Sequence, residues 1–144
     1  MPNYSEKFEK MRVAGKLAAE TLDMLTDNIK PGVTTEFIDK LGYEFIRDNG
    51  AYSAPLFYRG FKKSLCTSLN HVVCHGIPSD RVLNEGDALN VDVTAIINEH
   101  YGDTSRMFCI GKTPIKVNNL IDATYESMMK AIKLLKPGLR LGDI

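Results

Sequence analysis

The 144-residue sequence contains no tryptophan, only three cysteines and no excess of charge of either sign. Its 18 basic and 18 acidic residues cancel, so net charge gives no reason to expect nucleic acid or an anionic membrane as a partner. Cys66, Cys74 and Cys109 form an odd set without a CxxC pair. This argues against a disulfide framework or a zinc–cysteine site and favours a reducing, cytoplasmic location. No apolar run approaches the roughly 20 residues that cross a bilayer, and residues 1–20 lack the apolar core of a secretory signal.

Apolar periodicity predicts three helices in what is otherwise an ordinary composition, 44% hydrophobic and 25% charged. The first begins at the candidate N-cap Ser5 and ends at Lys30-Pro31-Gly32. The second begins after Thr34-Thr35 and ends at Asn49-Gly50. The third begins near Asn118. The apolar stripe of the first helix consists of Phe8, Met11, Gly15, Ala18, Leu22, Leu25 and Ile29.

The strands are predicted between the second and third helices. Short extended stretches cover residues 64–70 and 72–76, and a turn covers residues 84–87. Residues 88–97 and 100–111 form the strongest strand signal, a hairpin joined at Asn98-Glu99. The predicted fold class is therefore α+β.

A tripeptide repeats along the chain. Lys30-Pro31-Gly32 recurs as Lys136-Pro137-Gly138, 106 residues later. Apolar positions also match at the same offset of 106 residues. The matched pairs are Leu22 with Met128, Ile29 with Leu135, Val33 with Leu139 and Ile38 with Ile144. The pattern predicts an internal repeat whose second copy begins at about residue 118 and is cut off at residue 144.

Asp92 lies inside the most apolar strand, where an ionised carboxylate is costly to bury without a positive partner. Across the predicted hairpin, Asp103 falls on the same face, where two like charges repel. A divalent cation between them would remove both costs. Each residue also has a simpler explanation: Asp103 suits a turn or strand end, and Asp92 can accept hydrogen bonds from Asn90 or Thr94. As a pair, they favour a metal site.

His75 stands before Gly76 and Pro78, which fix the backbone and present the imidazole rigidly. From composition alone, a single histidine is more often a hydrogen-bonded structural residue than a catalytic one. Tyr58 and Phe61 are compatible with either a core or an apolar pocket.

Several short motifs resemble, in order and spacing, those of the type I methionine aminopeptidases. They run from about Glu9 to the last residue and comprise Lys10-Met11-Arg12-Val13-Ala14-Gly15, Lys30-Pro31-Gly32-Val33, Cys74-His75-Gly76-Ile77-Pro78, Gly86-Asp87, Asn90-Val91-Asp92-Val93-Thr94, Gly102-Asp103-Thr104-Ser105 and Met107-Phe108. Proline aminopeptidases and creatinase have similar duplicated folds but usually carry an extra N-terminal domain. The short N-terminus and the His-Gly-Ile-Pro segment favour the methionine enzyme.

This resemblance implies the first half of a pita-bread (creatinase/aminopeptidase) fold, an antiparallel sheet with helices on one face, with residues 1–144 as one incomplete domain. It implies that Asp92 and Asp103 bind two divalent ions (cobalt, manganese, iron or zinc), that Asp103 bridges them, and that Thr94 lies just behind the ligands.

The resemblance also implies a substrate site. His75 is the catalytic group that hydrogen-bonds the substrate, and it lines a methionine pocket with Tyr58, Phe61 and Cys66, although Phe61 is more often tyrosine in the family. The carbonyl groups of Asn70 and Val72 match those that hold a structural sodium or potassium ion.

The family's remaining ligands, one histidine and two glutamates, and a second substrate-contacting histidine have no counterpart in this sequence. We therefore expect a protein that removes the initiator methionine from nascent chains at the ribosome, in a truncated form that is inactive by itself. The alternative is a non-catalytic module that binds a peptide or a separately encoded partner half. An unrelated helix–hairpin scaffold would leave the acidic pair and the His-Gly-Ile-Pro segment unexplained.

Overall fold

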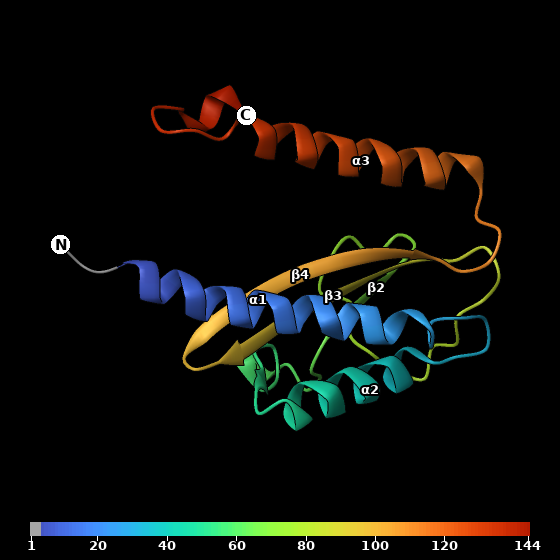
Figure 1. Ribbon diagram of the computed structural model, residues 1–144. Coiled ribbons are helices and arrows are strands. Elements are labelled where there is room, and N and C mark those ends of the chain that lie inside the picture. Colours follow the sequence, from blue (N-terminus) through green and yellow to red (C-terminus); the bar gives the residue numbers. More distant parts are fainter. Residues whose placement is uncertain (1–3) are drawn as a thin grey trace. The chain divides into compact units, whose positions relative to one another are not determined.

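The computed structural model describes residues 4–144, which divide into two compact units (Figure 1). The unit up to Lys112 contains helices α1 (Tyr4–Thr26) and α2 (Thr35–Asp48), and the short helical turn η1 (Tyr58–Gly60). It also contains the four strands β1 (Tyr52–Ser53), β2 (Cys66–Leu69), β3 (Ala88–Ile97) and β4 (His100–Cys109). The unit Thr113–Ile144 contains α3 (Ile115–Leu134) and the short turn η2 (Leu141–Asp143).

Strand β3 is the centre of the sheet, and all of its pairings are antiparallel. Along one edge β4 pairs with its whole length. Along the other edge β2 pairs with its first half and β1 with its C-terminal end. Helix α1 packs on β3 and β4, and α2 lies beside α1 over β1 and β2. The α+β fold class, with an antiparallel sheet and helices on one face, is confirmed (Figure 1).

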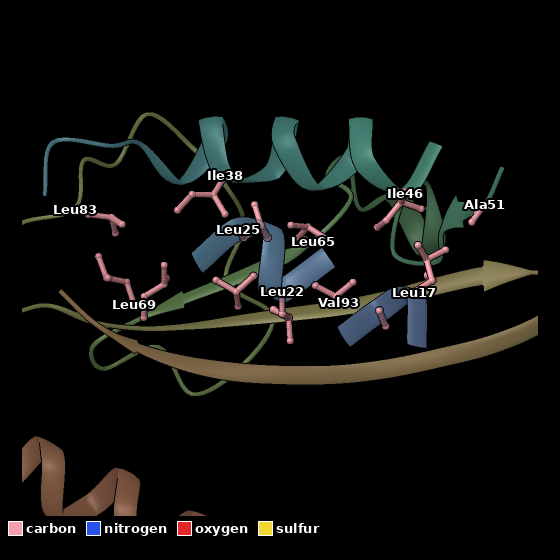
Figure 2. Packing of buried hydrophobic residues seen from close by; sticks show 14 of the residues in the cluster. Leu17, Leu22, Leu25, Ile38, Ile46, Ala51, Leu65, Leu69, Leu83 and Val93 are labelled. Carbon is pink, nitrogen blue, oxygen red and sulfur yellow. The ribbon is translucent and has the colours of Figure 1, made fainter. Parts of the chain in front are cut away.

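Alternation along β3 divides the sheet into two faces. Leu89, Val91, Val93 and Ala95 point toward the helices and are fully buried. They pack against leucine and isoleucine side chains from both helices, as Figure 2 shows, including Leu22, Leu25, Ile38 and Ile46. Burying a side chain of this size stabilises the fold by about 1.5–3 kcal/mol relative to leaving it exposed. The opposite face of β3 carries the polar side chains of Asn90, Asp92 and Thr94, with Ala88 and Ile96 at its ends.

Gly102 lets β4 approach α1 very closely. A Cβ atom added at Gly102 would lie 2.1 Å from the carbonyl oxygen of Ala14. Ala14 and Ala18 are fully buried on the helix side of this contact. The close approach brings the helix backbone onto the strand that carries Asp103.

The first helix differs from the prediction at both ends. Ser5 lies inside α1, so it is not the N-cap. Phe8 and Met11 belonged to the predicted stripe, but they are 54% and 52% exposed, and Phe8 stacks on the ring of Tyr4. The helix ends at Thr26 rather than at residue 30. There Thr26 and Asn28 donate side-chain hydrogen bonds to the carbonyl groups of Leu22 and Met24, which competes with continued helix.

The second helix agrees with the prediction. Thr34 caps it by accepting a hydrogen bond from the Phe37 amide at 3.2 Å, and Asn49 ends it before Gly50, whose φ is +73°. The hairpin also agrees, since β3 and β4 flank Asn98 and Glu99. Residues 72–76 do not form the predicted strand, because Asn70 (φ +53°) turns the chain out of the sheet. The third helix begins at Ile115, three residues before the predicted Asn118.

The two Lys-Pro-Gly segments form the same local turn. The amide of Val33 bonds to the carbonyl of Lys30, and the amide of Leu139 bonds to that of Lys136, each at 3.3 Å. Gly32 and Gly138 have φ of +89° and +95°. A helix of different length begins after each turn, α2 in one case and η2 in the other. Extension of this likeness to a complete internal repeat stays a prediction.

Substitution of Gly102 by alanine tests the contact between β4 and α1. Because the added Cβ meets backbone atoms that cannot rotate away, we expect Gly102→Ala to lower the free energy of unfolding by about 3 kcal/mol or more. Gly15→Ala is the matched control, since nothing lies within 4 Å of its added Cβ. In a helix it should be neutral or stabilise by up to about 1 kcal/mol. Urea unfolding measures both, and equal midpoints for the two variants would contradict the packing described.

Candidate metal centre

Asp92 and Asp103 lie on the same face of the sheet, opposite the helices. The register pairs Thr94 with Asp103 and Asp92 with Ser105, so the two carboxylates are diagonal neighbours on β3 and β4. Thr94 Oγ1 donates a hydrogen bond to Asp103 Oδ1 over 3.2 Å. The predicted placement of the acidic pair is confirmed. Their role as metal ligands stays a prediction.

The electrostatics of the pair fit a divalent cation. Burial raises the pKa of Asp92, and the charge of Asp103 and a hydrogen bond to it raise that pKa further, whereas His75 acts in the opposite direction. No ion pair found among residues 4–144 includes either carboxylate. Two adjacent carboxylates without a counter-charge are suitable oxygen donors for hard or borderline divalent ions.

The ligand set within this chain is small. No group of three or more His, Cys, Asp and Glu side chains able to hold a metal ion occurs in the part of the chain that the structure describes. The acidic pair therefore supplies two ligands, which is fewer than a paired-metal site needs.

His75 is held beside the pair by an unusual backbone. Its φ is +56°, in the left-handed region. The next residue, Gly76, accepts a hydrogen bond from the Thr67 amide at 2.8 Å and donates one to Ser68 Oγ at 3.1 Å. A Cβ on Gly76 would lie 2.2 Å from the Thr67 carbonyl oxygen. Strand β2 therefore fixes the segment that carries the imidazole.

Cys66 is the nearest β2 residue to the acidic pair. It pairs with Asp92 in the register and is buried. Burial raises the pKa of its thiol to about 11, with smaller contributions from Asp92 and Cys74. The thiol is therefore neutral at physiological pH in the metal-free chain, and it lines the pocket as an apolar group.

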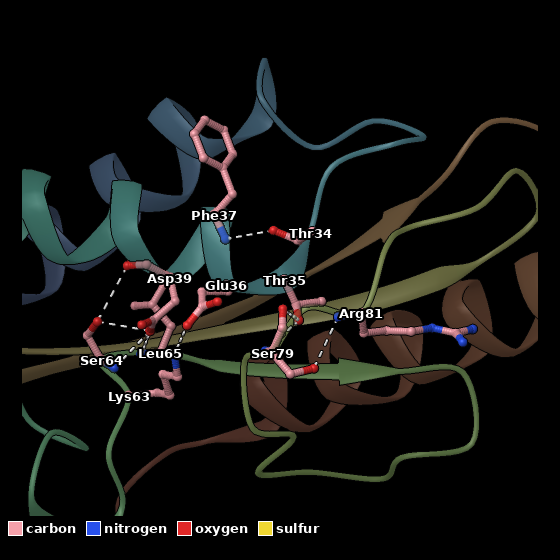
Figure 3. Close-up of polar contacts among 10 residues, drawn as sticks. All are labelled: Thr34, Thr35, Glu36, Phe37, Asp39, Lys63, Ser64, Leu65, Ser79 and Arg81. Atoms are coloured by element: carbon pink, nitrogen blue, oxygen red, sulfur yellow. Dashed lines mark hydrogen bonds and ion pairs between the residues drawn. The ribbon is translucent and has the colours of Figure 1, made fainter.

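Helix α2 anchors the chain on either side of these residues (Figure 3). Asp39 Oδ1 accepts hydrogen bonds from the amides of Ser64 and Leu65, both at 2.8 Å, immediately before Cys66. At the N-terminus of α2, Thr35 Oγ1 accepts a hydrogen bond from the Ser79 amide at 2.9 Å, just after the His75 segment. The positions of both segments thus depend on one helix.

A pocket of about 740 Å³ opens on this face of the sheet. It brings together the acidic pair, Thr94 and the four residues predicted for substrate binding, which are Tyr58, Phe61, Cys66 and His75. The prediction missed the other lining residues, which are Ala54, Pro55, Arg59, Gly60, Ile77 and Tyr101. Alternation along β4 could have identified Tyr101, because it shares the face of Asp103.

Asn70 and Val72 do not line the pocket. The Asn70 side chain is engaged, since its Nδ2 donates to Asp87 at 2.8 Å and its Oδ1 accepts from the Ala88 amide at 3.0 Å. These bonds hold the turn that leads out of β2. A role for the two carbonyl groups in binding a monovalent cation stays a prediction.

Comparisons with known proteins match nearly the whole chain. A family model, "Metallopeptidase family M24", matches residues 9–144. The curated methionine aminopeptidase of Rickettsia prowazekii is 56% identical over 142 residues, which are 98% of this chain and 55% of that protein. The protein of the same name from Escherichia coli strain K12 is 48% identical over 141 residues, 96% of this chain and 53% of that protein. The chain thus spans about half the length of the curated relatives that it matches.

Solved structures give the same picture. The crystal structure of the Rickettsia prowazekii methionine aminopeptidase superposes with a TM-score of 0.94 at 56% identity, covering 96% of this chain and 56% of that one. A Xaa-Pro dipeptidase from Bacillus anthracis superposes with a TM-score of 0.82 at 19% identity, covering 94% of this chain and 37% of that one, which shows the fold alone. The architecture is that of a pita-bread fold, as predicted.

Substitution of Asp92 by asparagine tests the electrostatics of the pair. Because the folded pKa of Asp92 is raised above the ordinary value of 3.8, the parent protein loses stability as pH rises from 3.8 through the raised pKa. We expect Asp92→Asn to melt higher than the parent at pH 7, and this difference to vanish below pH 3.8. Thermal melts across that range measure the effect. A higher melting temperature of the parent at pH 7, without added metal, would contradict repulsion between the carboxylates.

Substitution of Ser68 by alanine tests how the His75 segment is held. The variant leaves the buried Gly76 amide without an acceptor, so we expect a loss of about 1–3 kcal/mol in the free energy of unfolding. Ser105→Ala is the control, because Ser105 is exposed on the same face of the sheet. It should change stability by less than about 0.5 kcal/mol. Equal urea midpoints for the two variants would show that Ser68 does not anchor the segment.

Proposed function

Because this chain belongs to metallopeptidase family M24, we propose that the protein that carries it removes the N-terminal methionine from peptides with the help of two divalent metal ions. The relatives named above are methionine aminopeptidases. The observation that carries the proposal is the pocket, in which two carboxylates without counter-charges share one hollow with aromatic and apolar walls.

The acidic pair, Asp92 and Asp103, would bind the metal ions. A divalent ion bound there supplies Lewis acidity and lowers the pKa of water. Asp92 and Asp103 contribute oxygen ligands from two strands of one rigid hairpin. Thr94 restricts the Asp103 carboxylate by donating to Oδ1, which leaves the other carboxylate oxygen without this bond.

The walls would select and orient the peptide. Tyr58, Phe61 and the neutral thiol of Cys66 offer an apolar surface suited to an unbranched thioether side chain. His75, which lines the same pocket, would hydrogen-bond the first peptide carbonyl and stabilise the charge that develops on its oxygen. Its fixed left-handed backbone holds the imidazole in place for that bond.

The ligand count limits what these 144 residues do alone. With only two carboxylates, we propose that they bind a divalent ion weakly and do not catalyse hydrolysis. The alternative function is that of a non-catalytic module that binds a peptide or a partner half. The same geometry supports it, since the pocket walls are present while the metal ligands are few.

The setting of the activity belongs to the same proposal. The substrate would be the N-terminal methionine of nascent chains at the ribosome, in the cytoplasm, and cobalt, manganese, iron or zinc would fit the oxygen ligands. A structural sodium or potassium ion at Asn70 and Val72 would accompany them. Among the described helices, none is long and apolar enough to cross a membrane.

Hydrolysis of a Met-Gly-Met peptide with added cobalt or manganese tests the ligand count. We expect no turnover by the purified 144-residue chain, and a rise in its melting temperature with manganese that Asp103→Ala abolishes. Robust turnover that disappears in Asp103→Ala would contradict this expectation, and would mean that another copy supplies the missing ligands. An unchanged melting temperature at high manganese concentration would remove the acidic pair as a metal site.

A further inference from the structure

Arg59 belongs to a loop whose backbone is held in rare conformations. Phe57 and Arg59 have φ of +68° and +48°, and Gly60 has φ of +86°. Left-handed conformations are unfavourable for Phe and Arg, and such conformations concentrate at functional sites. The loop is closed by its own backbone, since the Phe57 amide donates to the Phe61 carbonyl at 2.7 Å and the Phe61 amide to the Tyr58 carbonyl at 3.0 Å. The Arg59 side chain is not needed to close it.

Arg59 is one of the residues that line the pocket. Its Cζ atom lies over the Tyr58 ring, 5.4 Å from the ring centroid, and both residues line the pocket. A guanidinium group over an aromatic ring makes a cation–π contact, and its five N–H donors can also donate hydrogen bonds to a ligand. No ion pair of Arg59 with an acidic side chain occurs among the described residues. By contrast, the neighbouring Lys63 is paired with Glu36.

Arg59 forms no ion pair with Asp92 or Asp103 among the described residues. Among the same residues, it is the sole Lys or Arg side chain in the lining of the pocket. The pocket therefore carries a negative pair at one place and an unpaired positive charge at another. Such a pocket suits a ligand that has opposite charges at two points.

We propose that Arg59 binds a carboxylate of the peptide in this pocket and so favours peptides with an acidic group close behind the N-terminal residue. The inference rests on the proposed function, because it takes the occupant of the pocket to be a peptide. The planar N–H fork of arginine matches a carboxylate in a two-pronged arrangement. The carboxylate comes from an acidic side chain that follows the first residue, or from the C-terminus of a very short peptide.

Peptide binding to the 144-residue chain tests the proposal, by calorimetry with manganese present. The probes are Met-Glu-Ala-Ala and Met-Ala-Glu-Ala, each against its glutamine counterpart and all with amidated C-termini. Met-Ala-Ala with a free or an amidated C-terminus tests the second source of carboxylate. We expect the carboxylate form in at least one of these pairs to bind about three- to tenfold tighter, with the difference falling as salt rises.

The variants separate charge from structure. Arg59→Gln should remove the preference, and Arg59→Lys should keep part of it, because lysine keeps the charge but not the fork. Arg47→Gln is the matched control, since Arg47 also lies over a tyrosine ring, that of Tyr43, at 5.8 Å, but is paired with Asp48 and lies outside the pocket. It should leave the preference unchanged. Equal affinities within all three pairs for the parent chain would overturn the proposal, as would a preference that survives in Arg59→Gln.

Peptides that differ in their first residue distinguish failure of the proposed function from failure of the role proposed for Arg59. Replacing Met by Gly at the first position of the preferred peptide should weaken binding if the walls select methionine. If Met and Gly peptides bind equally while the carboxylate preference depends on Arg59, the methionine specificity fails and the role of Arg59 stands. Absence of binding by every peptide would overturn both.

Discussion

The register between β3 and β4 is the constraint on which the rest of the structure depends. Asn98 and Glu99 both have positive φ, as the two central residues of a type I′ turn do, and this turn suits the twist of the paired strands. It places Thr94 opposite Asp103. Because side chains alternate between faces, the same register that sends the valines of β3 into the core sends both aspartates to the other side. The same strand register therefore determines both the packing of the core and the position of the acidic pair.

The pocket forms where irregular segments between Ala54 and Ile77 pack beside this hairpin. At Gly76 and at Gly102 two backbones approach too closely for any Cβ, in one case against β2 and in the other against α1. Helix α2 ties the remaining ends through Asp39 and Thr35 (Figure 3). Residues distant in sequence therefore take fixed positions in the pocket because close backbone approaches and hydrogen bonds between side chains and backbone hold their segments.

The sequence predicted what local pattern determines. The hairpin, both ends of α2 and the shared face of Asp92 and Asp103 follow from alternation, a threonine cap and turn residues. The errors occurred where single side chains or single backbone angles override the apolar pattern. Side-chain bonds from Thr26 and Asn28 end α1 early, and the left-handed Asn70 withdraws residues 72–76 from the sheet. Arg59 was missed because nothing in the local pattern shows which way an irregular loop directs its side chain. The likeness to methionine aminopeptidases supplied the candidate roles of His75 and Cys66, which no periodicity indicates.

The neutral thiol of Cys66 has a consequence for redox chemistry. Thiolates, and not thiols, react rapidly with oxidants and capture soft metal ions. Burial is the largest cause of the raised pKa of Cys66, so the thiol is protonated and reacts slowly with oxidants. Cys74 is exposed, whereas Cys66 is buried. Under oxidative stress, oxidation would therefore begin at Cys74 and spare the thiol of Cys66 in the pocket wall.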